Sequence, residues 1–260
     1  MAEAGVQVLK ERAGDLAGLR QLEQPSLASE AAERIVAGIA DGSLEPGQRI
    51  VESQLAEALA ISRIPIRDAL RALEKQGIVV VAPRRGARVM NIDLGLLMQV
   101  QQVRHDLELR ALADLIAVVR DNPALLEQGR GLLDRMDAAV ARGDRAGFND
   151  LDVDFHRWIC RSSGNHIVMT LWEALSHHMR ILLGRMAETW RDIAVSQASH
   201  CRIVELVATG DLDGLRAVMP GHLLDGVEQV SYDARRNRFV LHEMDATAKK
   251  TNTKKKEKAR

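Results

Sequence analysis

The sequence has little of what marks secreted, membrane-spanning or strongly charged proteins. Aromatic residues make up only 3% of the 260, and 36 basic residues balance 36 acidic ones. No apolar run reaches the length of a membrane span, and the first residues lack the apolar core of a signal peptide. The two cysteines, Cys160 and Cys201, lie in apolar helical patterns, as buried thiols of a reducing compartment do. We therefore expect a cytoplasmic protein in which any basic surface is local.

Aliphatic residues are plentiful instead, in a chain that is 46% hydrophobic. Their helical spacing favours helix-on-helix packing, and the length suits two domains. We expect a mainly α protein, with an N-terminal winged helix-turn-helix and a C-terminal all-helical antiparallel bundle. The expected division is a mobile leader (1–26), a winged-helix domain (27–91), a helical domain (94–233) and a basic, disordered tail (235–260). The tail holds ten basic and three acidic residues and few apolar ones after Leu241.

The order of elements in 27–91 is that of a winged helix. Apolar spacing predicts helices over 27–41, 52–60 and 62–76, with glycines at the ends of the first and last and Ser62 as a helix cap. The β-branched run 78–81 and the segment 87–90 predict two strands joined by a turn at 83–86. The turn carries two arginines and forms the tip of the wing.

The third predicted helix has the pattern of a recognition helix. Its apolar residues face inward at helical spacing, which leaves Arg63, Arg67 and Arg71 four residues apart on the outer face. An arginine fork can donate to both acceptors of a guanine edge in the major groove. The helix N-terminus makes most base contacts, so Arg63 and Arg67 are favoured as base readers over Arg71. The alternative is an ordinary exposed face, because 27–91 holds nine basic residues against eight acidic ones.

This segment resembles the GntR family of bacterial regulators. The likeness follows Leu44-Glu45-Pro46-Gly47, the run Ser62-Arg63-Ile64-Pro65-Ile66-Arg67-Asp68-Ala69-Leu70, and Pro83-Arg84-Arg85-Gly86-Ala87. Many members carry Thr where this chain has Ile64. The resemblance implies a DNA-binding transcriptional regulator, commonly a repressor, that contacts its operator through Ser62, Arg63, Pro65 and Arg67. It also implies contacts from the wing at Arg84, Arg85 and Gly86.

The second domain is similar to the FadR-like subfamily, whose FCD-type helical domain binds an effector and dimerises. Helices are expected over 94–119, 123–142, 145–162, 165–190, 194–209 and 212–233, and their short loops imply antiparallel neighbours. Arg104 stands four residues before Glu108, a setting in which the subfamily pairs an arginine with the carboxylate of a small organic acid. Asn165 is either a helix cap or a second effector contact.

Four residues match the metal-binding branch of that subfamily in order and spacing: Asp152, His156, His200 and His222. Asp152 and His156, four apart, project from one helix face. Three imidazoles and a carboxylate suit a divalent metal, with Zn²⁺ expected and Ni²⁺ or Mn²⁺ as alternatives. Pro220-Gly221 directly precedes His222, and a kink there could displace this ligand.

Three hypotheses follow for the whole chain. The leading one is a non-enzymatic, homodimeric regulator whose operator binding responds to a small carboxylic acid held by the metal. The second is a metal-dependent hydrolase, since such a metal can activate water, although no general acid or base stands beside the ligands in the sequence. The third is a metal-free sensor that binds its ligand through Arg104 and apolar contacts.

Overall fold

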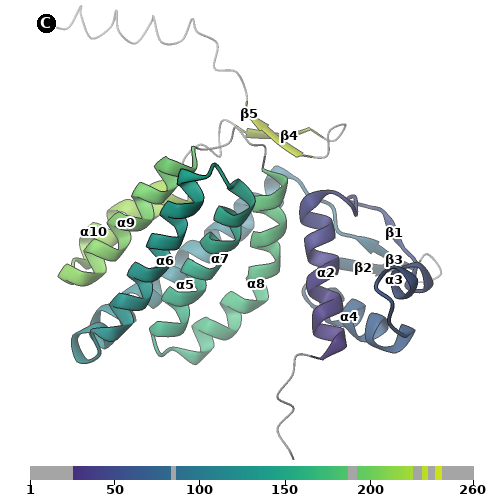
Figure 1. The fold of residues 1–260 in the computed structure, drawn as a ribbon, viewed down its shortest axis with the longest axis horizontal. Helices are drawn as coiled ribbons and strands as arrows, with labels where there is room; N and C mark the ends of the chain where they lie inside the picture. The colour runs from purple at the N-terminus through teal and green to yellow at the C-terminus, as the bar shows by residue number, and fades with distance from the viewer. Residues whose placement is uncertain (1–25, 83–85, 187–191, 225–229, 234–237, 242–260) are drawn as a thin grey trace, which may run out of the picture.

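The computed structural model describes residues 26–82, 86–186, 192–224, 230–233 and 238–241. Figure 1 shows a small N-terminal unit of helices and a sheet beside a larger bundle of helices. This confirms the predicted mainly helical fold, with a winged helix-turn-helix as the N-terminal domain. The predicted leader, Arg84 and Arg85 at the wing tip, and the end of the basic tail lie outside the described residues.

The N-terminal unit is built around three helices, α2 (Leu27–Asp41), α3 (Glu52–Ala58) and α4 (Arg63–Lys75). Strands β1 (Arg49–Ile50), β2 (Val79–Ala82) and β3 (Gly86–Val89) form an antiparallel sheet in the order β1-β3-β2. The short strand β1 was not predicted, since two residues carry no periodicity. Ser62 stands at the N-cap of α4, but its side chain makes no capping hydrogen bond. The core contains Ile35, Ile39, Ile66 and Leu73, all almost fully buried.

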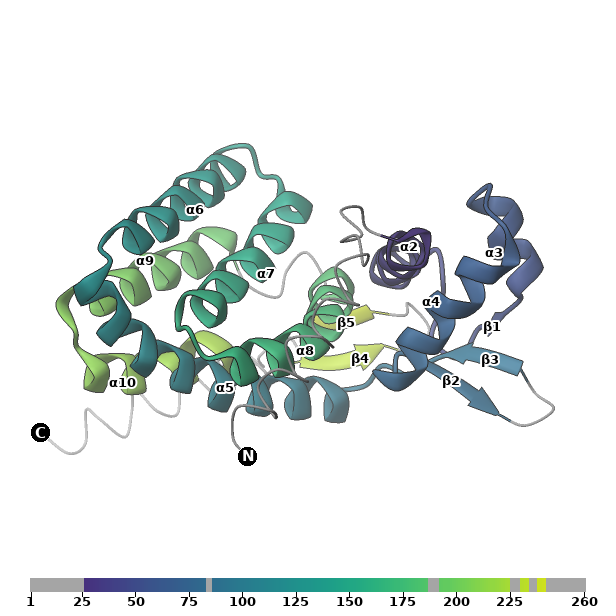
Figure 2. The same cartoon turned by 90° about the horizontal axis from the view of Figure 1, so that it is seen from below.

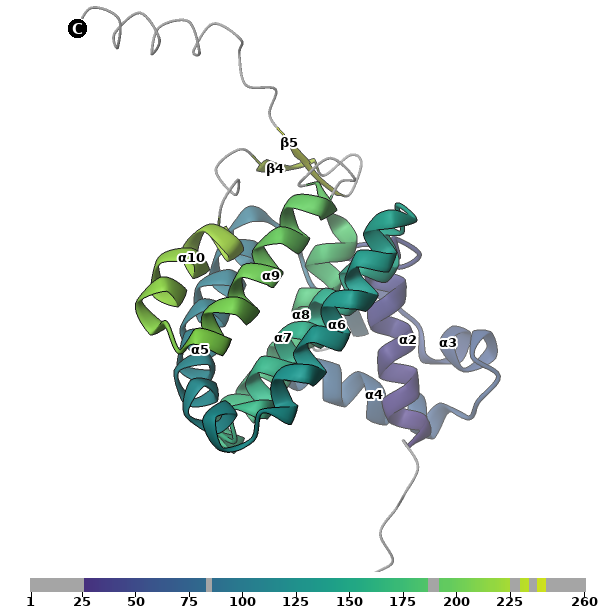
Figure 3. The same cartoon turned by 60° about the vertical axis from the view of Figure 1, so that its left-hand side comes forward.

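Six helices make the bundle: α5 (Leu94–Asp121), α6 (Ala124–Ala141), α7 (Arg145–Ser162), α8 (His166–Arg185), α9 (Ile193–Thr209) and α10 (Leu212–Leu224). Helix α5 packs on α7, α8 and α10, while α6 packs on α7 and α9, an arrangement visible in Figure 3. Phe155 and Trp172 are fully buried at its centre. Within the described residues, no helix is both long and apolar enough to span a membrane.

The C-terminal end of the bundle differs from the prediction. The last helix ends at Leu224 rather than at 233, and β4 (Val230–Asp233) pairs with β5 (Arg238–Leu241) as an antiparallel hairpin. The start of the predicted disordered tail is therefore a strand. Phe239 explains the difference, because its side chain is fully buried and its backbone bridges Met186 after α8. Short strands of this kind carry little periodic signal of their own, and the tertiary contact of Phe239 with the chain after α8 holds the hairpin in place.

Helix α2 lies along α8, and this pair joins the two domains (Figure 1). Nε2 of His177 lies 2.9 Å from Oε1 of Glu33 on α2, and Nδ1 of His177 lies 2.8 Å from Oε1 of Gln76. Arg180 forms an ion pair with the same Glu33. At the other end of the contact, Arg185 donates to the carbonyl of Leu44 at 2.9 Å. The DNA-binding domain is thus held against the bundle by polar contacts from the middle of α2 and from the turn that follows its C-terminal end.

Candidate functional site

The outer face of α4 is available to DNA. Arg63, Arg67 and Arg71 are exposed along it, while Ile66, Ala69, Leu70 and Leu73 are buried beneath. Ser62 is exposed and Pro65 partly so in the first turn. Arg67 is held by a carboxylate of α3, with its guanidinium 3.0 Å from Oε2 of Glu52. This hydrogen bond and the charge of Arg67 lower the pKa of Glu52.

The wing is the hairpin β2–β3, which lies beside α4 in Figure 2. Gly86 is exposed at the start of β3, and its φ of +75° favours glycine. Two further exposed arginines, Arg49 on β1 and Arg88 on β3, are paired across the sheet. Sequence reasoning did not single them out, because the pairing depends on the strand β1 that it did not predict. They add positive charge on the sheet that carries the wing.

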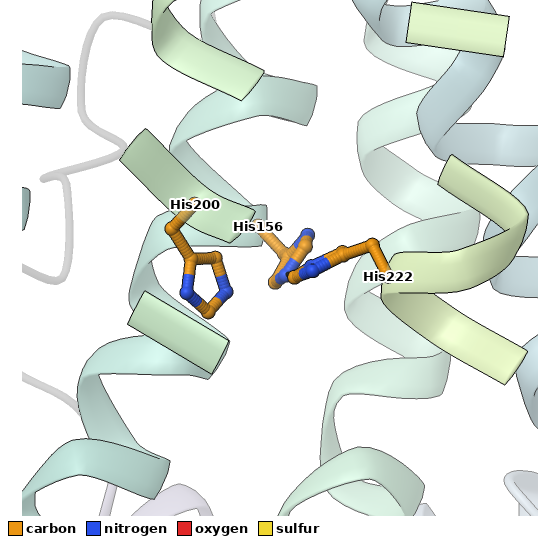
Figure 4. A group of neighbouring side chains, drawn as sticks. All are labelled: His156, His200 and His222. Atoms are coloured by element: carbon orange, nitrogen blue, oxygen red, sulfur yellow. Dashed lines mark hydrogen bonds between the residues drawn. The ribbon is translucent and has the colours of Figure 1, made fainter. Parts of the chain in front are cut away.

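Three histidines from three helices meet inside the bundle (Figure 4). His156 comes from α7, His200 from α9 and His222 from α10, and one nitrogen of each lies within 4.8 Å of the other two. Nε2 of His222 is 3.1 Å from Nε2 of His156. Pro220 lies inside α10 without ending it, so the kink considered above leaves His222 in the cluster.

Asp152, one turn before His156 on α7, completes the set. Its Oδ1 lies 3.1 Å from Nε2 of His200 and 3.9 Å from Nε2 of His156. Two ligand atoms that share one zinc ion, each about 2.1 Å from it, stand roughly 3.0–3.4 Å apart. The distances of 3.1 Å match that spacing. Neither nitrogen of the buried His200 makes a well-directed hydrogen bond within the described part of the chain. The four side chains therefore fit a divalent metal.

Glu108 on α5 orients His156 from behind. Its side chain is fully buried, and Oε2 lies 2.6 Å from Nδ1 of His156. Its Oε1 accepts hydrogen bonds from Nε of Arg104 at 2.6 Å and from Nε1 of Trp172 at 3.0 Å. Burial raises the pKa of Glu108, but the charges of Arg104 and His156 outweigh it, so the pKa falls to about 2. When His156 is neutral, an ionised Glu108 at 2.6 Å favours its proton on Nδ1, which leaves Nε2 free to bind a metal.

His222 is held in a similar way. Its Nδ1 lies 2.9 Å from the hydroxyl of Ser199, which can donate or accept. If Ser199 accepts, the lone pairs of His222 Nε2 and His156 Nε2 face the same point, where a cation stabilises them. Burial lowers the pKa of His222 well below its ordinary value, and the nearby His200 and His156 lower it further. A neutral imidazole of this kind is the form that binds metals.

A cavity opens beside the cluster. Arg104, Asp152 and His222 line one end, and Arg145, Asn149, Leu183 and Met186 are among its other walls. The cavity has a volume of about 70 Å³. At roughly 10–15 Å³ for each water molecule, this volume holds about five waters. The guanidinium of Arg104 also lies 3.7 Å from Oδ2 of Asp152. A buried arginine at the wall of a small cavity can receive a carboxylate.

Asn165 does not lie at this cavity. Its Oδ1 accepts from the backbone N–H of Val168 and so caps α8, and its Nδ2 donates to Asp114 on α5. Of the two alternatives for Asn165, the structure shows the cap. Glu108 and Ser199 are the residues that the sequence-based set of site residues left out. The position of Glu108, four residues after Arg104, was the only signal for it.

Two family models match the chain. "Bacterial regulatory proteins, gntR family" matches residues 27–89, and "FCD domain" matches residues 99–225. An uncharacterised HTH-type transcriptional regulator of Streptomyces ambofaciens is 30% identical over 198 residues, covering 72% of this chain and 79% of the relative. The chain belongs to the GntR family. The regulator thus pairs the family's winged helix-turn-helix with an FCD domain, and the histidine cluster lies within the FCD match.

Other relatives and a solved structure agree with this assignment. A probable D-xylose utilization operon transcriptional repressor of Paenarthrobacter nicotinovorans is 29% identical and aligns over 74% of this chain and 83% of its own. The structure of Escherichia coli McbR/YncC superposes with a TM-score of 0.67 at 23% identity, over 79% of this chain and 99% of that one. The chain is a transcriptional regulator of the GntR type with an FCD domain, a family that binds operator DNA.

Proposed function

We propose that this regulator is a metal-loaded repressor that binds operator DNA as a homodimer and responds to a small carboxylic acid. The observation that carries the proposal is the convergence of Asp152, His156, His200 and His222 beside Arg104, at a small cavity. The metal, which we take to be Zn²⁺, would supply open coordination positions for the acid. Arg104 would pair with its carboxylate from the adjacent wall.

The metal assignment is tested by elemental analysis of the purified full-length protein. We expect about one equivalent of a divalent metal, lost in His156→Ala. The control is His166→Ala, since His166 is an exposed residue at the start of α8. A metal-free wild type that still binds acetate through Arg104 would favour the metal-free sensor instead.

DNA reading is assigned to Arg63 and Arg67, with phosphate contacts from Arg71 and from the wing. We expect Arg63→Ala combined with Arg67→Ala to abolish binding to the promoter beside the protein's own gene in a gel-shift assay. Arg202→Ala combined with Arg216→Ala, at exposed arginines of α9 and α10, serves as the charge-matched control and should bind normally. Unchanged binding of the double variant would disprove the assignment.

The homodimer is proposed to form through α5 and α8, which lie side by side in Figure 2. Val103 on α5 and Ile167 and Leu171 on α8 are about half exposed or more, at 49%, 71% and 50%. Contacts of Asn165 with Asp114 and of Trp172 with Glu108 show that the two helices run antiparallel. Ile167 and Leu171 are four residues apart and so share one exposed face of α8. Two-fold operators need two recognition helices, and a second copy of the chain would cover this surface.

Light scattering after size exclusion tests the dimer. Leu171→Glu should yield a monomer with weakened operator binding. Val195→Glu, at a similarly exposed valine of α9, should stay dimeric. A dimeric Leu171→Glu variant would exclude this surface.

A further inference from the structure

Helices α2 and α8 contact each other at two places along the interface between the domains, and a cleft lies between these two contacts. On α8, a methyl group added to Gly184 would lie 2.8 Å from both Cβ and the carbonyl oxygen of Ala40, so the helices touch there. Two turns earlier on α2, Glu33 pairs with His177 and Arg180. Between these contacts, a cleft of about 390 Å³ lies between α2, α7 and α8.

This cleft adjoins the cavity beside the histidines. Arg145, Asn149, Leu183 and Met186 line both spaces, so their side chains form the partition between them. Along α7, Asp152 lies at the histidine cluster, Asn149 one turn earlier at the partition, and Ala146 one turn before that in the cleft. The cavity and the cleft therefore follow one another along α7 toward the DNA-binding domain.

The walls of the cleft are suited to an apolar chain. Ala37 and Ala40 of α2, Ala146 of α7 and Leu183 of α8 supply apolar surface. Four charged residues also line the cleft: Asp41, Arg145, Asp150 and Arg180. Arg180 already pairs with Glu33 and lies 3.8 Å from Asp150. The side-chain amide of Asn149 donates to the carbonyl of Leu183. Met186, with an unbranched and flexible side chain, is the part of the partition that moves most easily.

We propose that the interdomain cleft binds the apolar chain of the effector, whose carboxylate lies at Arg104 and the metal. This inference rests on the proposed function, and it narrows the effector to a carboxylic acid whose apolar chain is longer than the cavity beside the histidines can hold. Such a chain would pass the partition at Met186 and touch Ala37 on α2. The effector would then contact the DNA-binding domain directly.

The test is calorimetric titration of the full-length, Zn²⁺-loaded protein with unbranched carboxylic acids from acetate to octanoate. Each methylene that enters the cleft should strengthen binding about fourfold, the effect of burying one CH₂. Ala146→Leu and Ala37→Leu fill the cleft from two exposed positions and should abolish this gain while leaving acetate affinity unchanged. Ala117→Leu, at an exposed position of α5, should keep the gain.

The outcomes separate the inference from the function on which it rests. If octanoate binds Ala146→Leu and Ala37→Leu as tightly as the wild type, the cleft is excluded, while acetate binding that needs Zn²⁺ leaves the proposed function intact. If octanoate binding depends on the cleft but not on Zn²⁺, the cleft stands and the metal-bound carboxylate is wrong. If no acid of any length binds, both are overturned.

Discussion

Replacing Glu108 by glutamine tests whether this buried carboxylate prepares His156 for a metal. Glu108→Gln keeps the shape of the side chain but removes its charge and places an amide NH₂ where one oxygen stood. Oε1 can still accept from Arg104 and Trp172, so the NH₂ turns toward Nδ1 of His156, 2.6 Å from the present Oε2. His156 must then offer a lone pair at Nδ1 and carry its proton on Nε2, where the metal would bind.

Two losses follow from this exchange. Loss of such a partner behind a metal-binding histidine weakens metal affinity by about 10–100-fold, or roughly 1.4–2.7 kcal/mol. The metal-free protein should also be destabilised, because Arg104 keeps only Asp152 as a charge partner, at 3.7 Å. Breaking one side of a buried ion pair costs about 3–5 kcal/mol. Since the amide oxygen introduced by Glu108→Gln would still accept hydrogen bonds, we expect the lower end of that range.

Zn²⁺ affinity is measured by competition with a chromophoric chelator, and stability by urea unfolding of the metal-stripped protein. The matched control is Glu173→Gln on α8, where Glu173 pairs with Arg157 and is partly exposed. This control should keep its Zn²⁺ affinity and lose less than about 1 kcal/mol. A folded Glu108→Gln variant with wild-type Zn²⁺ affinity would refute the orienting role.

Three further predictions concern stability. The pKa of Glu33 is lowered to about 2, first by its hydrogen bond from the imidazole of His177. The contribution of Glu33 to the free energy of unfolding is therefore fully present above its ordinary pKa of 4.5 and is lost as the pH falls toward 2. Because Glu33 is half exposed, Glu33→Gln should cost only about 1 kcal/mol at pH 6 in urea unfolding, and the difference should shrink below pH 4.5 and vanish only as the pH reaches about 2. Gly129→Ala would place Cβ 2.5 Å from the ring of Trp158 and should lower the melting temperature by overpacking. Gly131→Ala, whose Cβ would meet no atom within 4 Å, should raise the melting temperature because alanine favours the helix. Equal shifts of the melting temperature in the two variants would contradict this reasoning. Phe239→Ala should cost about 3 kcal/mol and expose the β4–β5 hairpin to proteolysis, and an uncleaved hairpin would count against its anchoring role.

The helices could be predicted from the sequence because each carries its own periodic pattern and ends at a local signal. The boundaries of α7, 145–162, were predicted to the residue, since Gly143-Asp144 and Ser163-Gly164 flank it. The β4–β5 hairpin could not be predicted in the same way. Its two strands have four residues each, and Phe239 is buried only because the chain near Met186 packs over it.

The candidate site was predicted in part. The four metal-ligand candidates came from their match in order and spacing to the metal-binding branch of the FadR-like subfamily, and the structure brings them together across α7, α9 and α10. The contact of Glu108 with His156 depends on how α5 packs against α7, which no local pattern encodes. Asn165 was ambiguous because asparagine caps helices and binds ligands equally well, and its distance from the cavity became clear only in three dimensions.

The ion pair between Glu52 and Arg67 affects how such a regulator searches a genome. Affinity for random DNA comes from neutralised phosphates, and a domain with nine basic and eight acidic residues neutralises few of them. Because Glu52 holds Arg67, a single DNA-binding domain would dissociate quickly from non-operator DNA. In the proposed dimer, a long-lived complex with DNA then requires both DNA-binding domains to bind at the same time. The spacing that the helical domains impose on the two DNA-binding domains would therefore set the lifetime of the complex on its operator.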